Sequence, residues 1–159
     1  MKMTDDNKEI IFNNITKWLR DSNFVISEEK ITVVTSEFYA KAYLQSDHEY
    51  ILEIMSATGI ETRFALRIRL PVSEQQLENY ENLEPKEKLI FDDKMNAVIF
   101  PQRQSINIKE KSAFLEKTIS IDPKSIDAKQ EVVQNVSQLL ESAKKLELWF
   151  KQFFSNQRT

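Results

Sequence analysis

The C-terminal segment, about residues 127–155, has the most regular pattern of apolar side chains in the chain. Apolar residues recur at alternating spacings of four and three, which predicts one long amphipathic helix of about 43 Å. These residues are Val132, Val136, Leu139, Ala143, Leu146, Phe150 and Phe153. Val133, Leu140 and Trp149 widen the stripe beyond the two positions in seven of a coiled-coil seam. We therefore expect the helix to pack on a sheet or in a globular core.

A surface for this helix is predicted by the middle of the sequence. Residues 62–70 alternate strictly, with Phe64, Leu66 and Ile68 on one side and basic or small residues on the other. This pattern is typical of a strand that faces the core on one side and water on the other. Similar runs precede it at 31–35, 38–44 and 49–55, joined by predicted turns at Ser46-Asp47-His48 and Thr58-Gly59. Such short links favour an antiparallel meander.

The remaining segments complete an α+β order. Asp6 and Glu9 predict the N-terminal cap of a first helix over 6–22. Ser73 is a good cap for a helix over 74–83, and Pro85 suits the first turn of another. Two further strands are predicted at 105–109 and 113–121. We expect a single α+β domain over residues 1–159: N-terminal helix, antiparallel meander, middle helices, two further strands and a long C-terminal helix packed on the sheet.

Composition excludes several classes of protein. A single glycine, Gly59, stands where average usage would supply roughly eleven, so neither a nucleotide P-loop nor a dinucleotide fingerprint can be written. The chain has no cysteine and one histidine, which argues against a structural zinc site. A formal net charge of −3 offers no bulk attraction for nucleic acid or anionic membrane. We expect no cofactor, no membrane partner and a cytoplasmic location, because the polar, acidic N-terminus does not resemble a secretory signal.

The last turns of the C-terminal helix carry a concentration of large rings. Trp149, Phe150, Phe153 and Phe154 occur within six residues. Exposed aromatic patches commonly mark interfaces, so these residues are a candidate surface for a second copy or another protein. Burial within the same chain is the alternative.

A second candidate surface is the polar side of the predicted sheet. Arg63, Arg67 and Arg69 share one strand face and could receive carboxylates or phosphates. Tyr39, Lys41 and Tyr43 alternate on another strand and add the aromatic groups that single-stranded nucleic acids stack on. The alternative is a solvated face on which the arginines pair with Glu53 and other cross-strand acids.

Candidates for catalysis are few. Asp47, His48 and Glu49 are metal-ligand types, but consecutive residues rarely converge on one ion, and a hairpin-tip histidine is usually solvated. The pairs Glu28-Glu29 and Asp92-Asp93 are neighbours in sequence, so their carboxyl groups point in different directions. No catalytic residue is assigned.

The order of elements resembles the secretion-chaperone-like α+β fold of type III secretion chaperones, and is similar to a small uncharacterised prokaryotic family thought to share it. The residues that carry the resemblance are Ile15-Thr-Lys-Trp-Leu19, Ile68-Arg-Leu-Pro71 and Ile119-Ser-Ile-Asp122. The resemblance implies sheets and edge strands presented to protein partners, and often dimers. It supplies no functional residue.

Three functional hypotheses follow. The first is a non-enzymatic protein-binding module, chaperone-like or adaptor-like, that forms a homodimer or binds a protein partner. The second is single-stranded nucleic-acid binding through the basic sheet face. The third is an enzyme that uses carboxylates and a divalent ion.

Overall fold

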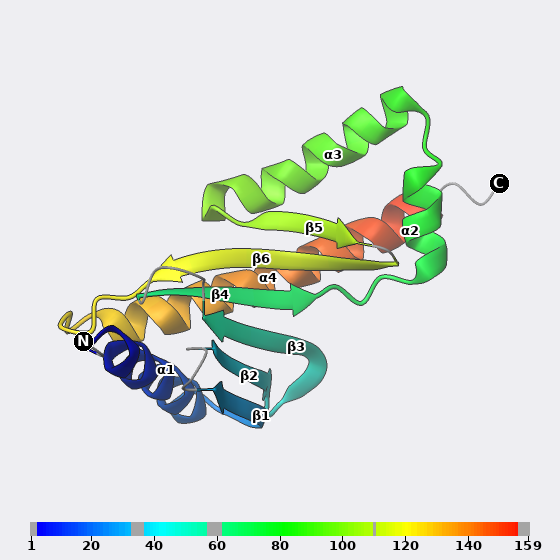
Figure 1. Ribbon diagram of the computed structural model, residues 1–159. Helices are drawn as coiled ribbons and strands as arrows, with labels where there is room; N and C mark the ends of the chain where they lie inside the picture. Colours follow the sequence, from blue (N-terminus) through cyan, green and yellow to red (C-terminus); the bar gives the residue numbers. More distant parts are fainter. Residues whose placement is uncertain (1–2, 33–36, 57–61, 110, 156–159) are drawn as a thin grey trace.

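The computed structural model describes residues 3–32, 37–56, 62–109 and 111–155. Its helices are α1 (Met3–Asp21), α2 (Glu74–Glu81), α3 (Pro85–Ile99), the short 3₁₀ turn η1 (Phe100–Gln102) and α4 (Ala128–Ser155). Its strands are β1 (Phe24–Thr32), β2 (Glu37–Leu44), β3 (Asp47–Ser56), β4 (Arg63–Arg69), β5 (Ser105–Lys109) and β6 (Ser112–Ser120). They form the α+β fold predicted from the sequence (Figure 1).

The strands of the described residues belong to one antiparallel sheet in the order β1-β2-β3-β4-β6-β5. Strands β1 to β4 form the predicted meander. The chain then leaves the sheet through α2 and α3, and on its return β6 pairs with β4. Strand β5 pairs with β6 alone, so β5 forms one edge of the sheet and β1 the other.

The core lies between one face of the sheet and the helices α1 and α4. Leu52, Ile68 and Leu115 align across β3, β4 and β6, and all three are fully buried. Helix α4 packs against β4 and β6, while α1 packs against β1 and β2 and touches α4 (Figure 1). The prediction that the C-terminal helix packs on the sheet is therefore confirmed. Its apolar stripe from Val132 to Phe150 is buried.

Local sequence signals place the middle helices. The Ser73 hydroxyl accepts a hydrogen bond from the backbone N–H of Gln76, and the Gln76 side chain accepts one from the backbone N–H of Ser73, which forms a capping box. Pro85 occupies the first turn of α3, where its missing N–H costs nothing. Both starts agree with the sequence-based prediction.

Two boundaries near the N-terminus differ from the prediction. Helix α1 begins at Met3, three residues before Asp6, so the cap predicted at Asp6 is wrong and Asp6 lies within the first turns of the helix. Strand β1 begins at Phe24, seven residues before the first predicted strand. Its Glu28-Glu29-Lys30 run resembles a loop, but an edge strand tolerates charges because one face and one edge meet water. Residues 33–36 and the turn predicted at Thr58-Gly59 lie outside the described residues.

Candidate functional site

The polar face of the sheet carries charges of alternating sign. Across the strands, Lys41 pairs in register with Glu53, Glu53 with Arg67, and Arg67 with Glu116. The Nε of Arg67 donates to Oε1 of Glu53 at 3.0 Å, and its guanidinium lies 4.5 Å from the centre of the Phe114 ring. Arg67 is therefore held by its own sheet, as the alternative interpretation of the arginine row proposed.

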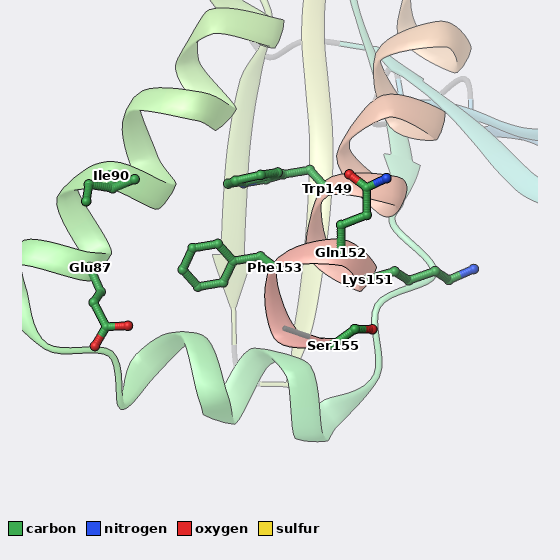
Figure 2. Close-up of a pocket in the computed structure, with 7 residues that line it drawn as sticks. All are labelled: Glu87, Ile90, Trp149, Lys151, Gln152, Phe153 and Ser155. Atoms are coloured by element: carbon green, nitrogen blue, oxygen red, sulfur yellow. The ribbon is translucent and has the colours of Figure 1, made fainter. Parts of the chain in front are cut away.

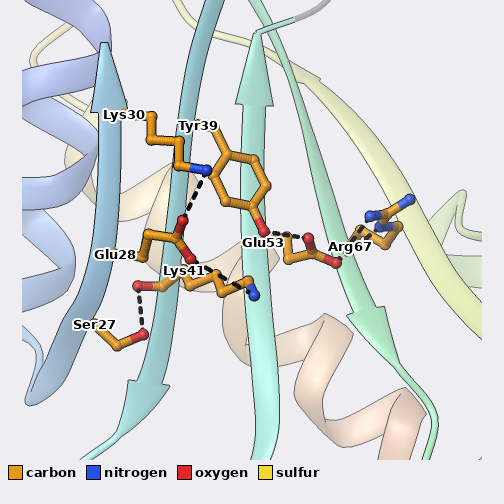
Figure 3. Close-up of polar contacts among 7 residues, drawn as sticks. All are labelled: Ser27, Glu28, Lys30, Tyr39, Lys41, Glu53 and Arg67. Atoms are coloured by element: carbon orange, nitrogen blue, oxygen red, sulfur yellow. Dashed lines mark hydrogen bonds and ion pairs between the residues drawn. The ribbon is translucent and has the colours of Figure 1, made fainter.

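The predicted aromatic residues of this face are also engaged. The Tyr39 hydroxyl donates to the second oxygen of Glu53 at 2.5 Å, so that Glu53 lies between Tyr39 and Arg67 (Figure 3). The pKa of Tyr39 is raised far above its ordinary value. Partial burial is the main cause, and the bond to Glu53 is the second. Tyr43 packs edge-on against the His48 ring, with ring centres 4.7 Å apart.

The remaining basic residues of the face divide into two groups. Lys30 and Lys41 both pair with Glu28, at 3.1 and 3.6 Å, and the hydrogen bond from Lys30 is the main reason that the pKa of Glu28 is lowered (Figure 3). Arg63 and Arg69 are exposed and make no ion pair with any described residue. A hollow of about 570 Å³ lies over the face, lined by Lys41, Arg67 and Arg69 but also by Glu49 and Glu53. The face is thus mixed in charge.

The three residues considered as metal ligands, Asp47, His48 and Glu49, make separate contacts and do not converge on one point. They lie at the start of β3, where Leu44 pairs with Asp47 across a tight turn. One oxygen of Asp47 accepts the backbone N–H of Glu49 at 3.1 Å, and the other lies 3.6 Å from Nζ of Lys144. The His48 ring is 3.1 Å from the backbone oxygen of Gln45. No group of three or more histidine, aspartate or glutamate side chains suited to a metal ion occurs in the part of the chain that the structure describes.

Sequence reasoning missed a buried carboxylate at the junction of β3 and α4. Glu147 accepts a hydrogen bond from the Tyr50 hydroxyl and another from Nζ of Lys151 at 2.8 Å. Burial alone would raise the pKa of Glu147, but the bonds from Lys151, Tyr50 and Glu49 outweigh it and lower the pKa. The bond to Glu147 raises the pKa of Glu49 in turn. The helical period gave a hint, since Glu147 falls beside Leu146 and Phe150 on the apolar stripe.

The candidate aromatic interface is partly internal. Phe150 and Phe154 are buried, while Trp149 and Phe153 are half-buried. All four rings surround Phe91 of α3, with centre-to-centre distances of 4.8–5.7 Å. The end of α4 therefore serves first to attach α3 to the body of the protein. This use was not visible in the sequence, because Phe91 lies far from α4 along the chain.

A groove remains between α3 and α4 beside this cluster. It has a volume of about 760 Å³, and Trp149 and Phe153 extend from α4 toward Ile90 and Glu87 of α3 (Figure 2). Leu89 and Ile90 are largely exposed on α3. Trp149 and Phe153 therefore form one wall of a groove that α3 completes.

The free edge of β5 is the second unfilled surface near α3. In an antiparallel strand, one residue directs both its N–H and its C=O toward a given neighbouring strand, and the next residue directs both away from it. The backbone oxygen of Ala113 accepts the N–H of Leu70 at 2.9 Å, on the β4 side. Ile108, which pairs with Ala113, therefore directs its own N–H and C=O away from β6, and Ile106 does so by the same alternation. Among the described residues, no other segment pairs with this edge.

Two hollows follow this edge and meet at Ile108. One, of about 420 Å³, lies between β5 and α3 and has Met95, Ile99 and Ile106 among its walls. The other, of about 350 Å³, lies against α2 and is lined by Leu77 and by acidic residues. Its acidic residues are Glu74, Glu78 and Glu81. We call the two hollows together the β5 groove.

Gln104 lies at the start of the β5 groove. Arg103 adopts a left-handed backbone conformation with φ of 56°, which turns the chain from η1 into β5, and the backbone N–H of Gln104 donates to the oxygen of Ile99 at 3.1 Å. The Gln104 side chain is 4% exposed, and neither its amide oxygen nor its nitrogen has a hydrogen-bond partner in the described structure. A buried amide without partners costs folding free energy.

Comparison with known proteins identifies a likeness in fold. No protein-family model matches the chain, and no curated protein matches it in sequence. A solved structure of an uncharacterised protein from Methanothermobacter thermautotrophicus is similar over 91% of this chain and 99% of its own, with a TM-score of 0.68 and 13% identity. At that identity the likeness shows the fold alone. Among the described residues, no helix has the length and apolarity needed to cross a membrane.

Proposed function

We propose that the protein is a binding module that holds an extended segment of a partner protein along the free edge of β5. The observation that carries the proposal is the outward-facing backbone of Ile106 and Ile108 beside the β5 groove. An added strand would gain main-chain hydrogen bonds from this edge and side-chain contacts from the hollows. A chaperone-like or adaptor-like role of this kind is also what the resemblance to secretion-chaperone-like folds implies.

The opposite edge of the sheet supports the choice of β5. Strand β1 carries Glu28, Glu29 and Lys30 and contains a register shift between Ile26 and Glu28. Charges and bulges are the devices by which proteins protect an edge from pairing with other chains. Strand β5 has the sequence Ser-Ile-Asn-Ile-Lys, and its pairing with β6 continues without a register shift. The two edges therefore differ in the way expected of one protected edge and one binding edge.

Charge around the β5 groove indicates the kind of partner. Glu74 and Glu81 make long ion pairs of 3.8 Å with Lys111 and Lys88, and the four side chains are 36–76% exposed. Glu78 makes no ion pair with a described residue. Exposed pairs of this length contribute little and can be exchanged for others. We therefore propose a segment that alternates apolar residues with basic ones and binds with Kd on the order of micromolar, because a strand as short as β5 supports a small interface.

The test begins with selection of binders from a displayed library of random nine-residue peptides. The affinities of the selected peptides are then measured by fluorescence anisotropy for the wild type, for Ile108→Pro and for the matched control Ile108→Val. Proline removes the outward N–H of position 108 and spares the ladder to β6, so we expect at least tenfold weaker binding for Ile108→Pro and little change for Ile108→Val. Circular dichroism checks that each variant is folded.

Hydrogen exchange gives a readout that does not depend on the variants. The amides of Ile106 and Ile108 should become protected when a selected peptide is added, since they would donate to the new strand. Equal affinity for Ile108→Pro together with unprotected amides would refute the proposal. Failure to select any peptide from the library would also refute it.

The same variants also test two alternatives to a partner segment, a second copy of the chain and a single-stranded nucleic acid. Sedimentation across a concentration series detects a homodimer, and loss of that dimer in Ile108→Pro would assign the β5 edge to a second copy. Binding through the sheet face is detected with a single-stranded oligonucleotide at low salt. That affinity would fall steeply with added salt and on replacing Arg63 and Arg69. It has less support, because Arg67, Lys41 and Tyr39 already contact carboxylates.

A further inference from the structure

We infer that the segment held on β5 is recognised through a carboxamide side chain, asparagine or glutamine, that pairs with the buried amide of Gln104. This inference rests on the proposed function and concerns the hollow between β5 and α3. Its basis is the single side chain Gln104, whose two amide atoms are buried and have no hydrogen-bond partner among the described residues. Gln104 itself lines the hollow.

A glutamine at position 104 does not help to stabilise the fold. A leucine of similar size would fill the same volume and leave no polar atom unpaired, and replacing an unpaired buried polar group by an apolar one is neutral or stabilising. The surrounding side chains include Met95, Ile99 and Ile106, so the position is apolar in character. An amide retained in such surroundings is expected to have a partner in the functional state.

The geometry of an amide restricts what that partner can be. A primary carboxamide presents one acceptor and one donor side by side, and the group that satisfies both in one plane is a second carboxamide in the reverse orientation. A ligand carboxylate offers only acceptors and would also face the charge of Asp92. A ligand ammonium offers only donors. The main-chain N–H and C=O groups of the added strand that face β5 pair with Ile106 and Ile108, so a side chain is the group left to reach Gln104.

The neighbouring polar groups leave this role to Gln104. The Tyr80 hydroxyl donates to Asp92 at 2.7 Å, so one oxygen of that carboxylate is already used. Asn96 and Ser105 are the other polar residues of the hollow and lie at its rim, half-buried or exposed. An amide pair formed beneath them would be shielded from water, which strengthens each hydrogen bond.

The experiment uses two displayed libraries of random nine-residue peptides, one with all amino acids and one without asparagine and glutamine. We expect the wild type to select peptides from the first library that bind at least tenfold more tightly than any from the second. Gln104→Leu should lose this difference and melt at a higher temperature than the wild type. A merely structural glutamine would leave the selectivity unchanged.

Two results separate this inference from the proposed function. Binders of equal affinity from both libraries, all weakened by Ile108→Pro, would overturn the role of Gln104 and retain the β5 edge. Binders that Ile108→Pro does not weaken would overturn both. A single-site control, Gln104→Glu, keeps the size of the side chain but removes the amide donor; it should weaken carboxamide peptides as Gln104→Leu does, without raising the melting temperature.

Discussion

Replacement of Phe91 by alanine tests whether one side chain attaches α3 to the rest of the protein. Phe91 is fully buried, and its ring lies 4.8–5.7 Å from four rings of α4 and 5.2 Å from Tyr80. Its contacts with Phe150 and Phe153 are edge-to-face, with interplanar angles of 75° and 80°. The geometry is the one that aromatic pairs favour beyond simple burial of area.

The expected cost follows from these contacts. Removal of a buried phenyl group loses its transfer free energy and leaves a cavity, which together cost about 3–5 kcal/mol. The lower half of this range applies if α3 moves toward α4 and closes the groove beside Trp149. For a chain of this length, the loss corresponds to a fall in melting temperature of roughly 6–20 °C. Denaturant unfolding followed by circular dichroism measures the free energy directly.

The chain offers a matched control. Phe100 follows α3 directly and is 67% exposed, so Phe100→Ala makes the same chemical change without opening a cavity. We expect it to alter the free energy of unfolding by no more than about 0.5 kcal/mol. A cost below about 1 kcal/mol for Phe91→Ala, or equal costs for the two variants, would refute the conclusion that the aromatic cluster holds α3 in place.

Two further predictions concern stability. Ser73→Ala removes half of the capping box of α2 and should cost about 1 kcal/mol in denaturant unfolding; an unchanged free energy would show that the cap contributes nothing. Glu147→Gln should destabilise the protein at pH 7 by about 1–3 kcal/mol, because Tyr50 then donates to a neutral group. Since the folded pKa of Glu147 is lowered, its stabilisation is present above the ordinary value of 4.5 and is lost as the pH falls through the folded pKa. The difference between wild type and Glu147→Gln should therefore shrink on acidification, and a difference that does not depend on pH would contradict the assigned charge.

Much of the fold could be predicted because each element carries its own local signal. The alternation around Phe64, Leu66 and Ile68, the cap at Ser73 and the proline at the start of α3 depend on residues within a few positions of one another. Strand β1 was harder to predict, since its charged residues are permitted only by its position at the edge of a sheet. That position is a property of the assembled sheet.

The candidate sites were predictable in composition but not in arrangement. The sequence showed that Trp149 and Phe153 form a concentrated aromatic group, but not that Phe91 would fill its centre. It showed Arg67 on a strand face, but the register that places Glu53 beside it comes from the pairing of β3 with β4. Glu147 and Gln104 gave little or no signal, because a buried polar residue looks like a surface one until its neighbours are known.

By itself, the sequence determined most of the helices and strands, β1 excepted, and which side of each is apolar, because those properties follow from periodicity along the chain. The long C-terminal stripe already required a sheet or core to cover it. The tertiary structure decided that β6 pairs with β4 and leaves β5 at the edge, beside α3 and its buried amide. Two short strands in one hairpin can dock in either order, and the order is decided by contacts between residues far apart in sequence, which no local pattern records.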